Sequence, residues 1–104
     1  MLQTKAFRGK RTTVKYRIPI WNNNTFYEAF VTVVPRNKTA TGVEEYARML
    51  NEKDVDYTPE ELADRIRYDF QNALQPKFLR VIVKVSGVHT LVISDGGGSN
   101  ATEV

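Results

Sequence analysis

Few side chains in this sequence can do acid–base or covalent chemistry. The chain has no cysteine and a single histidine, His89, so thiolate nucleophiles, disulfides and thiolate-bound metals are excluded. An imidazole titrates near pH ~6.5, which makes His89 a candidate proton carrier near a subunit interface. The alternative is that His89 is a structural or solvent-facing residue at the start of a strand. A zinc or iron site within one chain would depend almost wholly on carboxylates, so we expect no metal cofactor.

The second chemical feature is a run of cations near the beginning of the chain. The net charge is +3, and before the first acidic residue, Glu28, the basic side chains are Lys5, Arg8, Lys10, Arg11, Lys15 and Arg17. If these side chains are ordered on one face, they create a positive field that attracts the phosphates of a nucleotide or nucleic acid. The alternative is a set of solvated residues on an N-terminal arm and a first strand.

The strands that would position these residues follow from the hydrophobic pattern. Apolar and polar residues alternate from Thr12 to Ile20, which predicts a half-buried strand. Three asparagines then favour a turn, and the β-branched and aromatic residues of Phe26 to Val34 predict the second strand of a hairpin. Phe78 to Val85 and His89 to Ser94 predict two further strands, separated by a turn.

Two helices are expected between these pairs of strands. Thr41 can cap a first helix, with Glu44 closing the capping box. A second helix has a stronger start signal, because Thr58 suits the N-cap, Pro59 the first helical position and Glu61 the box. The predicted order is therefore strand-strand-helix-helix-strand-strand.

We predict an α+β fold in which an antiparallel four-stranded sheet carries two helices on one face. With 104 residues, the chain fits a single domain over residues 1–95 with a basic N-terminal arm, followed by a flexible glycine-rich tail at 96–104. No apolar run approaches the ~20 residues that cross a bilayer, and no secretory signal is evident. We therefore expect a cytoplasmic protein without membrane contact.

One segment carries a family resemblance. Leu74-Gln75-Pro76-Lys77-Phe78-Leu79-Arg80-Val81 resembles the Leu-x-Pro-(Arg/Lys)-(Tyr/Phe)-(Ile/Leu)-x-Val segment of the 7-cyano-7-deazaguanine reductases, which are nitrile reductases. They belong to the tunnelling-fold superfamily, together with GTP cyclohydrolase I. The resemblance extends from Lys15 to Asp95. It implies a ββααββ domain that assembles into a ring-shaped barrel, with ligand sites between the chains of a homo-oligomer.

The resemblance places one family substrate residue on this chain. Glu60 matches the glutamate that holds the edge of the deazapurine ring. A carboxylate can accept paired hydrogen bonds from the ring and amino N–H groups of a guanine-like base. The alternative explanation is that a glutamate in the first turn of a helix is favoured by the helix dipole without any ligand.

The other positions of the family's active site carry different residues. Ile18 stands in the place of the catalytic cysteine and cannot form its covalent thioimide. Thr25 replaces the proton-donating aspartate and Pro59 the histidine before the substrate glutamate, while Thr41 replaces a further glutamate. Val88-His89-Thr90 replaces the Arg-Gly-Gly stretch linked to the phosphates of the nicotinamide cofactor. We therefore expect no bound cofactor and no nitrile reductase activity, and a cyclohydrolase zinc site lacks its cysteine and histidine ligands.

Two functions remain open on this basis. The first is a catalytically altered relative of the nitrile reductases that binds a purine- or pterin-like base through Glu60. The second is a non-enzymatic oligomer that binds nucleic acid, or serves as an assembly protein, through the basic N-terminal segment. Aromatic residues on the strands can stack on a base, but packing is the expectation for them: Tyr16, Trp21, Phe26 and Tyr27.

Overall fold

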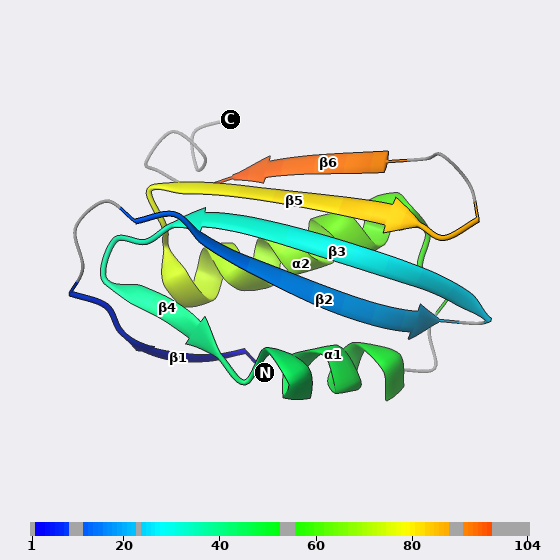
Figure 1. The fold of residues 1–104 in the computed structure, drawn as a ribbon, viewed down its shortest axis with the longest axis horizontal. Helices are drawn as coiled ribbons and strands as arrows, with labels where there is room; N and C mark the ends of the chain where they lie inside the picture. Colours follow the sequence, from blue (N-terminus) through cyan, green and yellow to red (C-terminus); the bar gives the residue numbers. More distant parts are fainter. Residues whose placement is uncertain (1, 9–11, 23, 53–55, 88–90, 97–104) are drawn as a thin grey trace.

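The structure is a computed structural model that describes residues 2–8, 12–22, 24–52, 56–87 and 91–96. Along the chain these residues form β1 (Gln3–Ala6), β2 (Val14–Asn22), β3 (Thr25–Val34), β4 (Lys38–Thr41), α1 (Val43–Glu52), α2 (Pro59–Leu74), β5 (Phe78–Val85) and β6 (Leu91–Gly96). Figure 1 shows the four long strands in front and α2 behind them. The predicted α+β architecture is confirmed.

The main sheet is antiparallel and has the strand order β2-β3-β5-β6. β2 and β3 form the predicted hairpin, in which Asn22 pairs with Thr25 across a two-residue turn. Asn24 in this turn has a φ of 65°, a left-handed conformation that asparagine tolerates better than most residues. The hairpin fixes which side chains of β2 and β3 lie opposite each other.

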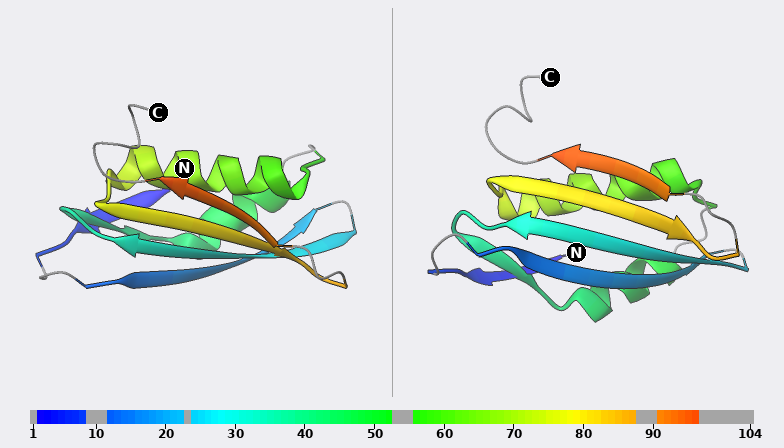
Figure 2. Two further views of the ribbon diagram at one scale, coloured as in Figure 1. Left: turned by 90° about the horizontal axis from the view of Figure 1, so that it is seen from above. Right: turned by 45° about the horizontal axis from the view of Figure 1, so that its top comes forward.

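A second, two-stranded sheet pairs β1 with β4, with Gln3 opposite Thr41. Residues 3–6 of the expected N-terminal arm form a strand of this ribbon. It lies on the helix side of the main sheet (Figure 2), and Leu2 and Ala40 from the ribbon are buried in the core. It also separates the basic run, since Lys5 lies in the ribbon whereas Lys15 and Arg17 lie in the main sheet.

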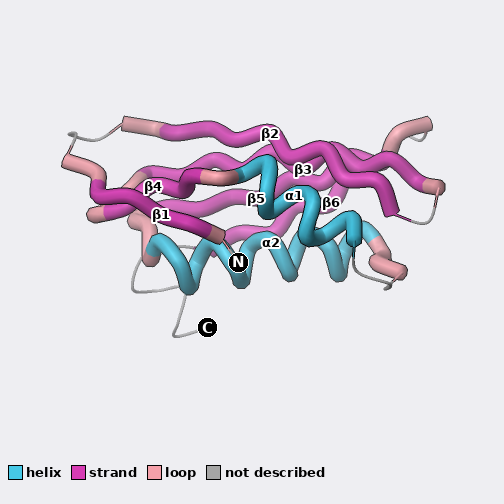
Figure 3. The backbone as a smooth tube through the Cα atoms, turned by 90° about the horizontal axis from the view of Figure 1, so that it is seen from below, coloured by secondary structure: helices cyan, strands magenta, loops and turns pink. Residues whose placement is uncertain are grey.

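One hydrophobic core lies between the main sheet and the helices. The inward positions of β2, β3 and β5 are fully buried at residues such as Ile18, Val31 and Val81. From the other side, α1 contributes Leu50 and α2 contributes Phe70, both without exposed surface. Figure 3 shows both helices on the same side of the sheet, as predicted. The alternation that predicted the strands therefore also predicted their buried face.

The two predicted helix starts have different outcomes. Thr58 caps α2 and Glu61 completes the capping box, with Pro59 at the start of the helix, as predicted. The prediction for α1 is wrong by one residue. Gly42, at a φ of 63°, accepts the first helical hydrogen bond from the Tyr46 N–H, so Thr41 ends β4 rather than capping the helix. Gly42 adopts a left-handed backbone there that a threonine would strain to reach.

The last strand also differs from the prediction. β6 extends two residues beyond the predicted end at Ser94, and Asp95 pairs with Arg80 of β5, so residue 96 belongs to the sheet rather than to the tail. The glycine-rich segment from residue 97 lies outside the described residues. No helix in the described part of the chain is long and apolar enough to cross a bilayer.

Candidate functional site

The start of α2 combines a complete cap with a neighbouring carboxylate. The Glu61 N–H donates to Thr58 Oγ1 at 3.1 Å, and the Thr58 N–H donates to Glu61 Oε1 at 3.0 Å. The hydrogen bond from the Thr58 backbone N–H to the carboxylate, and secondarily one from the Thr58 side chain, lower the pKa of Glu61. Glu60 is exposed, and its carboxylate has no hydrogen-bond or ion-pair partner among the described residues. The helix cap is therefore provided by Glu61, which leaves Glu60 accessible from solvent.

The segment before α2 is anchored to the turn end of the β2–β3 hairpin. The Tyr57 N–H donates to Asn22 Oδ1 at 3.0 Å, and the Tyr27 hydroxyl donates to the Tyr57 carbonyl at 3.2 Å. Thr25 pairs with Asn22 across the hairpin. The structure therefore brings Thr25 and the start of α2 to the same end of the domain, the end at the β2–β3 turn in Figure 1.

Other positions that the resemblance singles out lie elsewhere. Ile18 has no exposed surface and belongs to the core, so position 18 borders no opening to solvent in the described chain. Thr41 ends β4 on the ribbon, in the other half of the domain from the β2–β3 turn. His89 and the 88–90 stretch lie outside the described residues. Among the residues that are described, no cluster of three or more His, Asp or Glu side chains could hold a metal ion.

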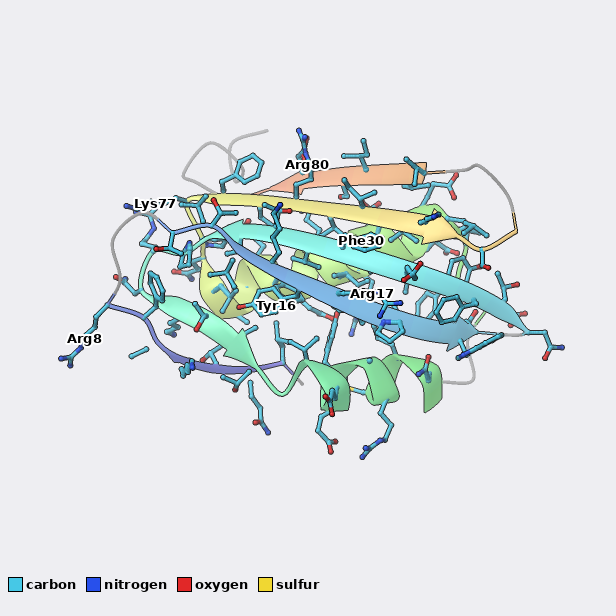
Figure 4. The ribbon with its side chains drawn as sticks, viewed as in Figure 1. Arg8, Tyr16, Arg17, Phe30, Lys77 and Arg80 are labelled. Atoms are coloured by element: carbon cyan, nitrogen blue, oxygen red, sulfur yellow. The ribbon has the colours of Figure 1, made fainter. Side chains whose placement is uncertain are left out.

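The face of the main sheet opposite the helices forms a second candidate site, which we call the open face. It consists of the outward positions of four strands: Lys15, Arg17, Pro19, Trp21, Phe26, Glu28, Phe30, Thr32, Val34, Phe78, Arg80, Ile82, Lys84, Leu91, Ile93 and Asp95. Several large apolar side chains remain accessible, including Trp21 at 61%, Ile93 at 56% and Phe30 at 37% exposure. In Figure 4, Arg17, Phe30 and Arg80 extend from neighbouring strands on this face. Apolar and cationic groups are therefore interleaved on one accessible surface.

Two arginines of the open face have carboxylate partners. Arg17 Nε donates to Glu28 Oε2 at 2.6 Å across the β2–β3 pair. Arg80 makes a two-point contact with Asp95, at 2.7 and 3.2 Å, and its guanidinium also lies 5.8 Å from the centre of the Phe78 ring. The hydrogen bond with Asp95, together with its charge, raises the pKa of Arg80. These pairs fix both guanidinium groups on the open face, and Arg80 lies beside the Phe78 ring.

The expectation that the strand aromatics pack in the core or in subunit contacts is met within the chain by two of the four. Tyr27 is buried, and Tyr16 contacts Phe70 of α2 with 5.5 Å between ring centres. Trp21 and Phe26 instead lie on the open face, where their rings contact each other with centres 4.9 Å apart. The sequence signal for this difference is parity, because alternate residues of a strand face opposite sides.

A third feature is a cleft between the ribbon and the two helices, of about 510 Å³. Its lining includes Leu2 and Met49 as apolar walls and Tyr46, Asp69 and Arg65 as polar groups. The Tyr46 hydroxyl donates to Asp69 Oδ2 at 2.6 Å, and Arg65 Nε lies 3.4 Å from the same oxygen. Burial, with the hydrogen bond and charge of Asp69, raises the pKa of Tyr46 above its usual value. The hydroxyl, carboxylate and guanidinium groups are partners of one another, so we interpret the Tyr46–Asp69 hydrogen bond as a structural tie that holds α1 against α2.

Comparison with known proteins supports the fold. Neither the protein-family models nor the curated proteins contain a match to this sequence. Among solved structures, the chain is similar to the apo form of an archaeosine synthase described as QueF-like, with a TM-score of 0.64 and 23% sequence identity. The alignment covers 88% of this chain and 98% of that protein. The predicted tunnelling-fold architecture is therefore confirmed at the level of the fold.

Proposed function

We propose that this chain is a QueF-like-fold protein that binds a purine- or pterin-like base through Glu60 without the thiol chemistry of the nitrile reductases. The observation that carries the proposal is the contrast between two adjacent glutamates. Glu61 is engaged in the cap of α2, whereas Glu60 is exposed and has no partner among the described residues. A carboxylate held on a rigid first turn can accept two hydrogen bonds from the edge of a guanine-like base.

The absence of thiol chemistry follows from the sequence and from position 18. The chain has no cysteine, and Ile18 is wholly buried, so no nucleophile is present at the position that the resemblance implies. We expect the purified protein to show no NADPH-dependent reduction of 7-cyano-7-deazaguanine. Detection of that reaction with pure protein would overturn this part of the proposal.

The proposal includes assembly of several copies, with the base bound at the boundary between subunits. β2 and β6 are the edge strands of the main sheet, and an edge strand offers unpaired backbone groups to a neighbour. Part of the β2 edge is occupied, because the Trp21 N–H donates to Asn51 Oδ1 of α1 at 2.7 Å and Pro19 has no N–H. Size-exclusion chromatography with light scattering tests the assembly, and a monomer at all concentrations would contradict it.

Thermal unfolding with a panel of guanine, deazaguanine, pterin and urate compounds tests the base site. A ligand at ~100 times its Kd stabilises the native state by about 2.7 kcal/mol, which corresponds to a rise in Tm of roughly 10–20 °C for a domain of this size. We expect one compound to produce such a shift, and Glu60→Gln to abolish it.

Glu61→Gln is the matched control. It changes the neighbouring carboxylate, which serves the helix cap, so we expect a lower starting Tm and an unchanged ligand shift. No shift with any compound, or a shift that survives Glu60→Gln, would contradict the proposed base site.

A further inference from the structure

Charge is unevenly divided between the two layers of the domain. The described side chains of the helices include the acidic residues Glu44, Glu45, Glu60, Glu61, Asp64 and Asp69 against three arginines. The four strands of the main sheet carry four basic and two acidic residues, all on the open face. The open face is therefore net positive and the two helices are net negative, although the ribbon on the helix side adds Lys5 and Lys38. The open face thus attracts a polyanion, whereas the helices repel it.

Exposed rings and cations lie beside each other at several points of the open face. Phe30, at the centre of the face, lies opposite Arg17 on β2 and opposite Ile82 on β5. Two residues further along the same strands, Lys15 and Arg80 flank Thr32. Phe30 is therefore an accessible ring that lies opposite a cation on β2 and diagonal to the cations Arg80 and Lys84 on β5.

Further rings lie at the two ends of the open face. The Trp21–Phe26 pair lies at the hairpin end, and Phe78 lies beneath the Arg80 guanidinium at the other end. Trp21 and Phe78 are 61% and 39% exposed. Rings at both ends and at the centre extend the interleaved surface over the length of the sheet.

We propose that the open face binds single-stranded nucleic acid. Bases stack on the faces of Phe30, Phe78 and Trp21, and Lys15 and Lys84 contact the phosphates between them. Stacking is tolerant of sequence, because every base offers a π-face, and a positive groove or surface follows the backbone. This site differs from the base site at Glu60, which lies at the start of α2 on the acidic helix layer.

The chemistry of the face favours this ligand over other occupants. Duplex DNA offers mainly its phosphates to a flat sheet, so the exposed rings would have no partner. A second copy of the chain would bring an identical face, with four basic and two acidic residues, against the first. Single strands offer both anions and unstacked bases, and they match the mixture of groups on the open face.

Fluorescence anisotropy with a labelled oligonucleotide of about ten nucleotides tests the proposal, over a range of salt concentrations. Stacking contributes about 1–3 kcal/mol per base. We therefore expect Phe30→Leu, which removes the ring but keeps an apolar side chain, to weaken oligonucleotide binding by about fivefold or more. Tyr68→Leu is the matched control, since Tyr68 is a 57% exposed ring on α2, and it should leave binding unchanged.

The cationic part of the site has its own readout. Affinity for a single strand falls as salt rises, and each lost phosphate contact makes the plot of log affinity against log salt less steep by about 0.7. The double variant Lys15→Gln with Lys84→Gln should therefore make this plot less steep by about 1.4. Arg48→Gln, on the exposed surface of α1, should not change it.

Four results would overturn the proposal. The first two are no oligonucleotide binding at low salt and an equal loss of oligonucleotide affinity in Phe30→Leu and Tyr68→Leu. The third is that the matched duplex binds as tightly as the single strand. The fourth is that Phe30→Leu loses self-association and keeps its affinity for nucleic acid. The last result would assign the open face to a second copy of the chain. Because the test leaves Glu60 unchanged, its failure is distinguishable from failure of the base site.

Discussion

The tie between Tyr46 and Asp69 allows a prediction of how stability depends on pH. Tyr46 is only 1% exposed, and its hydroxyl donates to Asp69 Oδ2 at 2.6 Å. Tyr46→Phe removes this hydrogen bond but retains the ring, which contacts Phe70 edge-on with centres 6.0 Å apart. A hydrogen bond to a charged group contributes about 1.5–3 kcal/mol to stability. We expect a loss near 1.5 kcal/mol at neutral pH, because Asp69 keeps Arg65 as a partner.

The destabilisation caused by Tyr46→Phe should disappear at alkaline pH. Burial, followed by the hydrogen bond to Asp69, raises the pKa of Tyr46 from its usual 10.0. A pKa that is raised on folding contributes stability below the unfolded value, and this stability is lost as the pH rises above it. Near pH 11 the unfolded phenol is ionised whereas the folded one is not, so unfolding gains about 1.4 kcal/mol. Phenylalanine cannot ionise, and the difference between the two proteins should therefore fall almost to zero.

Urea unfolding of wild type and Tyr46→Phe at about pH 7 and pH 11 measures both differences. Tyr68→Phe provides the control at neutral pH, because this exposed ring should change the free energy of unfolding by less than about 0.5 kcal/mol. If the gap between wild type and Tyr46→Phe is the same at both pH values, the phenol ionises as easily in the folded chain as in the unfolded one. That result would refute the buried tie between α1 and α2.

Three further predictions concern single positions. Ile18→Cys should lower the free energy of unfolding by about 1–3 kcal/mol and yield a thiol that a disulfide reagent labels slowly. Pro19→Cys, on the open face, should be labelled at once, and equal labelling rates would contradict the burial of position 18. Thr58→Ala should lower the free energy of unfolding by about 1 kcal/mol, because it removes the acceptor for the Glu61 N–H; an unchanged urea midpoint would argue against the cap. Thr39→Val should raise it by about 1 kcal/mol, since Thr39 Oγ1 is buried without a hydrogen-bond partner among the described residues; a lower midpoint would mean that the hydroxyl is satisfied.

Local physics explains which elements could be predicted from the sequence. Thr58, Pro59 and Glu61 act on backbone groups within one turn, so their residue types alone specified the start of α2. Alternation over eight or more residues likewise identified β2 and β5 together with their buried faces, whereas β-branched and aromatic residues identified β3. These signals need no information from distant parts of the chain.

The ribbon of β1 and β4 could not be predicted in this way. All residues of β1 are exposed, so the sequence Gln3–Ala6 has no apolar alternation to mark a strand. β1 exists because it pairs with β4, more than thirty residues later in the chain. The N-terminus of α1 was misplaced for a related reason. The sequence does not show that Thr41 is needed to pair with Gln3, which leaves Gly42 to begin the helix.

The candidate sites show the same division between local and distant signals. Parity along β5 indicated that Arg80 and Lys84 face away from the core, but only the strand register shows that they share a face with Lys15 and Phe30. The basic N-terminal run suggested a different grouping, which the ribbon divides. A patch formed by four strands depends on pairing, and a single sequence does not specify pairing.

Position 18 shows how packing and chemistry compete for one place in this fold. A fully buried isoleucine contributes about 1.5–3 kcal/mol relative to an exposed one, and Ile18 has no exposed surface. A cysteine at the same depth would remain a protonated thiol and therefore a poor nucleophile, because burial in apolar surroundings raises the pKa of a thiol. The position can therefore stabilise this core or serve as a reactive group, but not both. In this chain it stabilises the core, so ligand recognition is left to surface groups, for which we propose Glu60 at the start of α2 and the rings and cations of the open face.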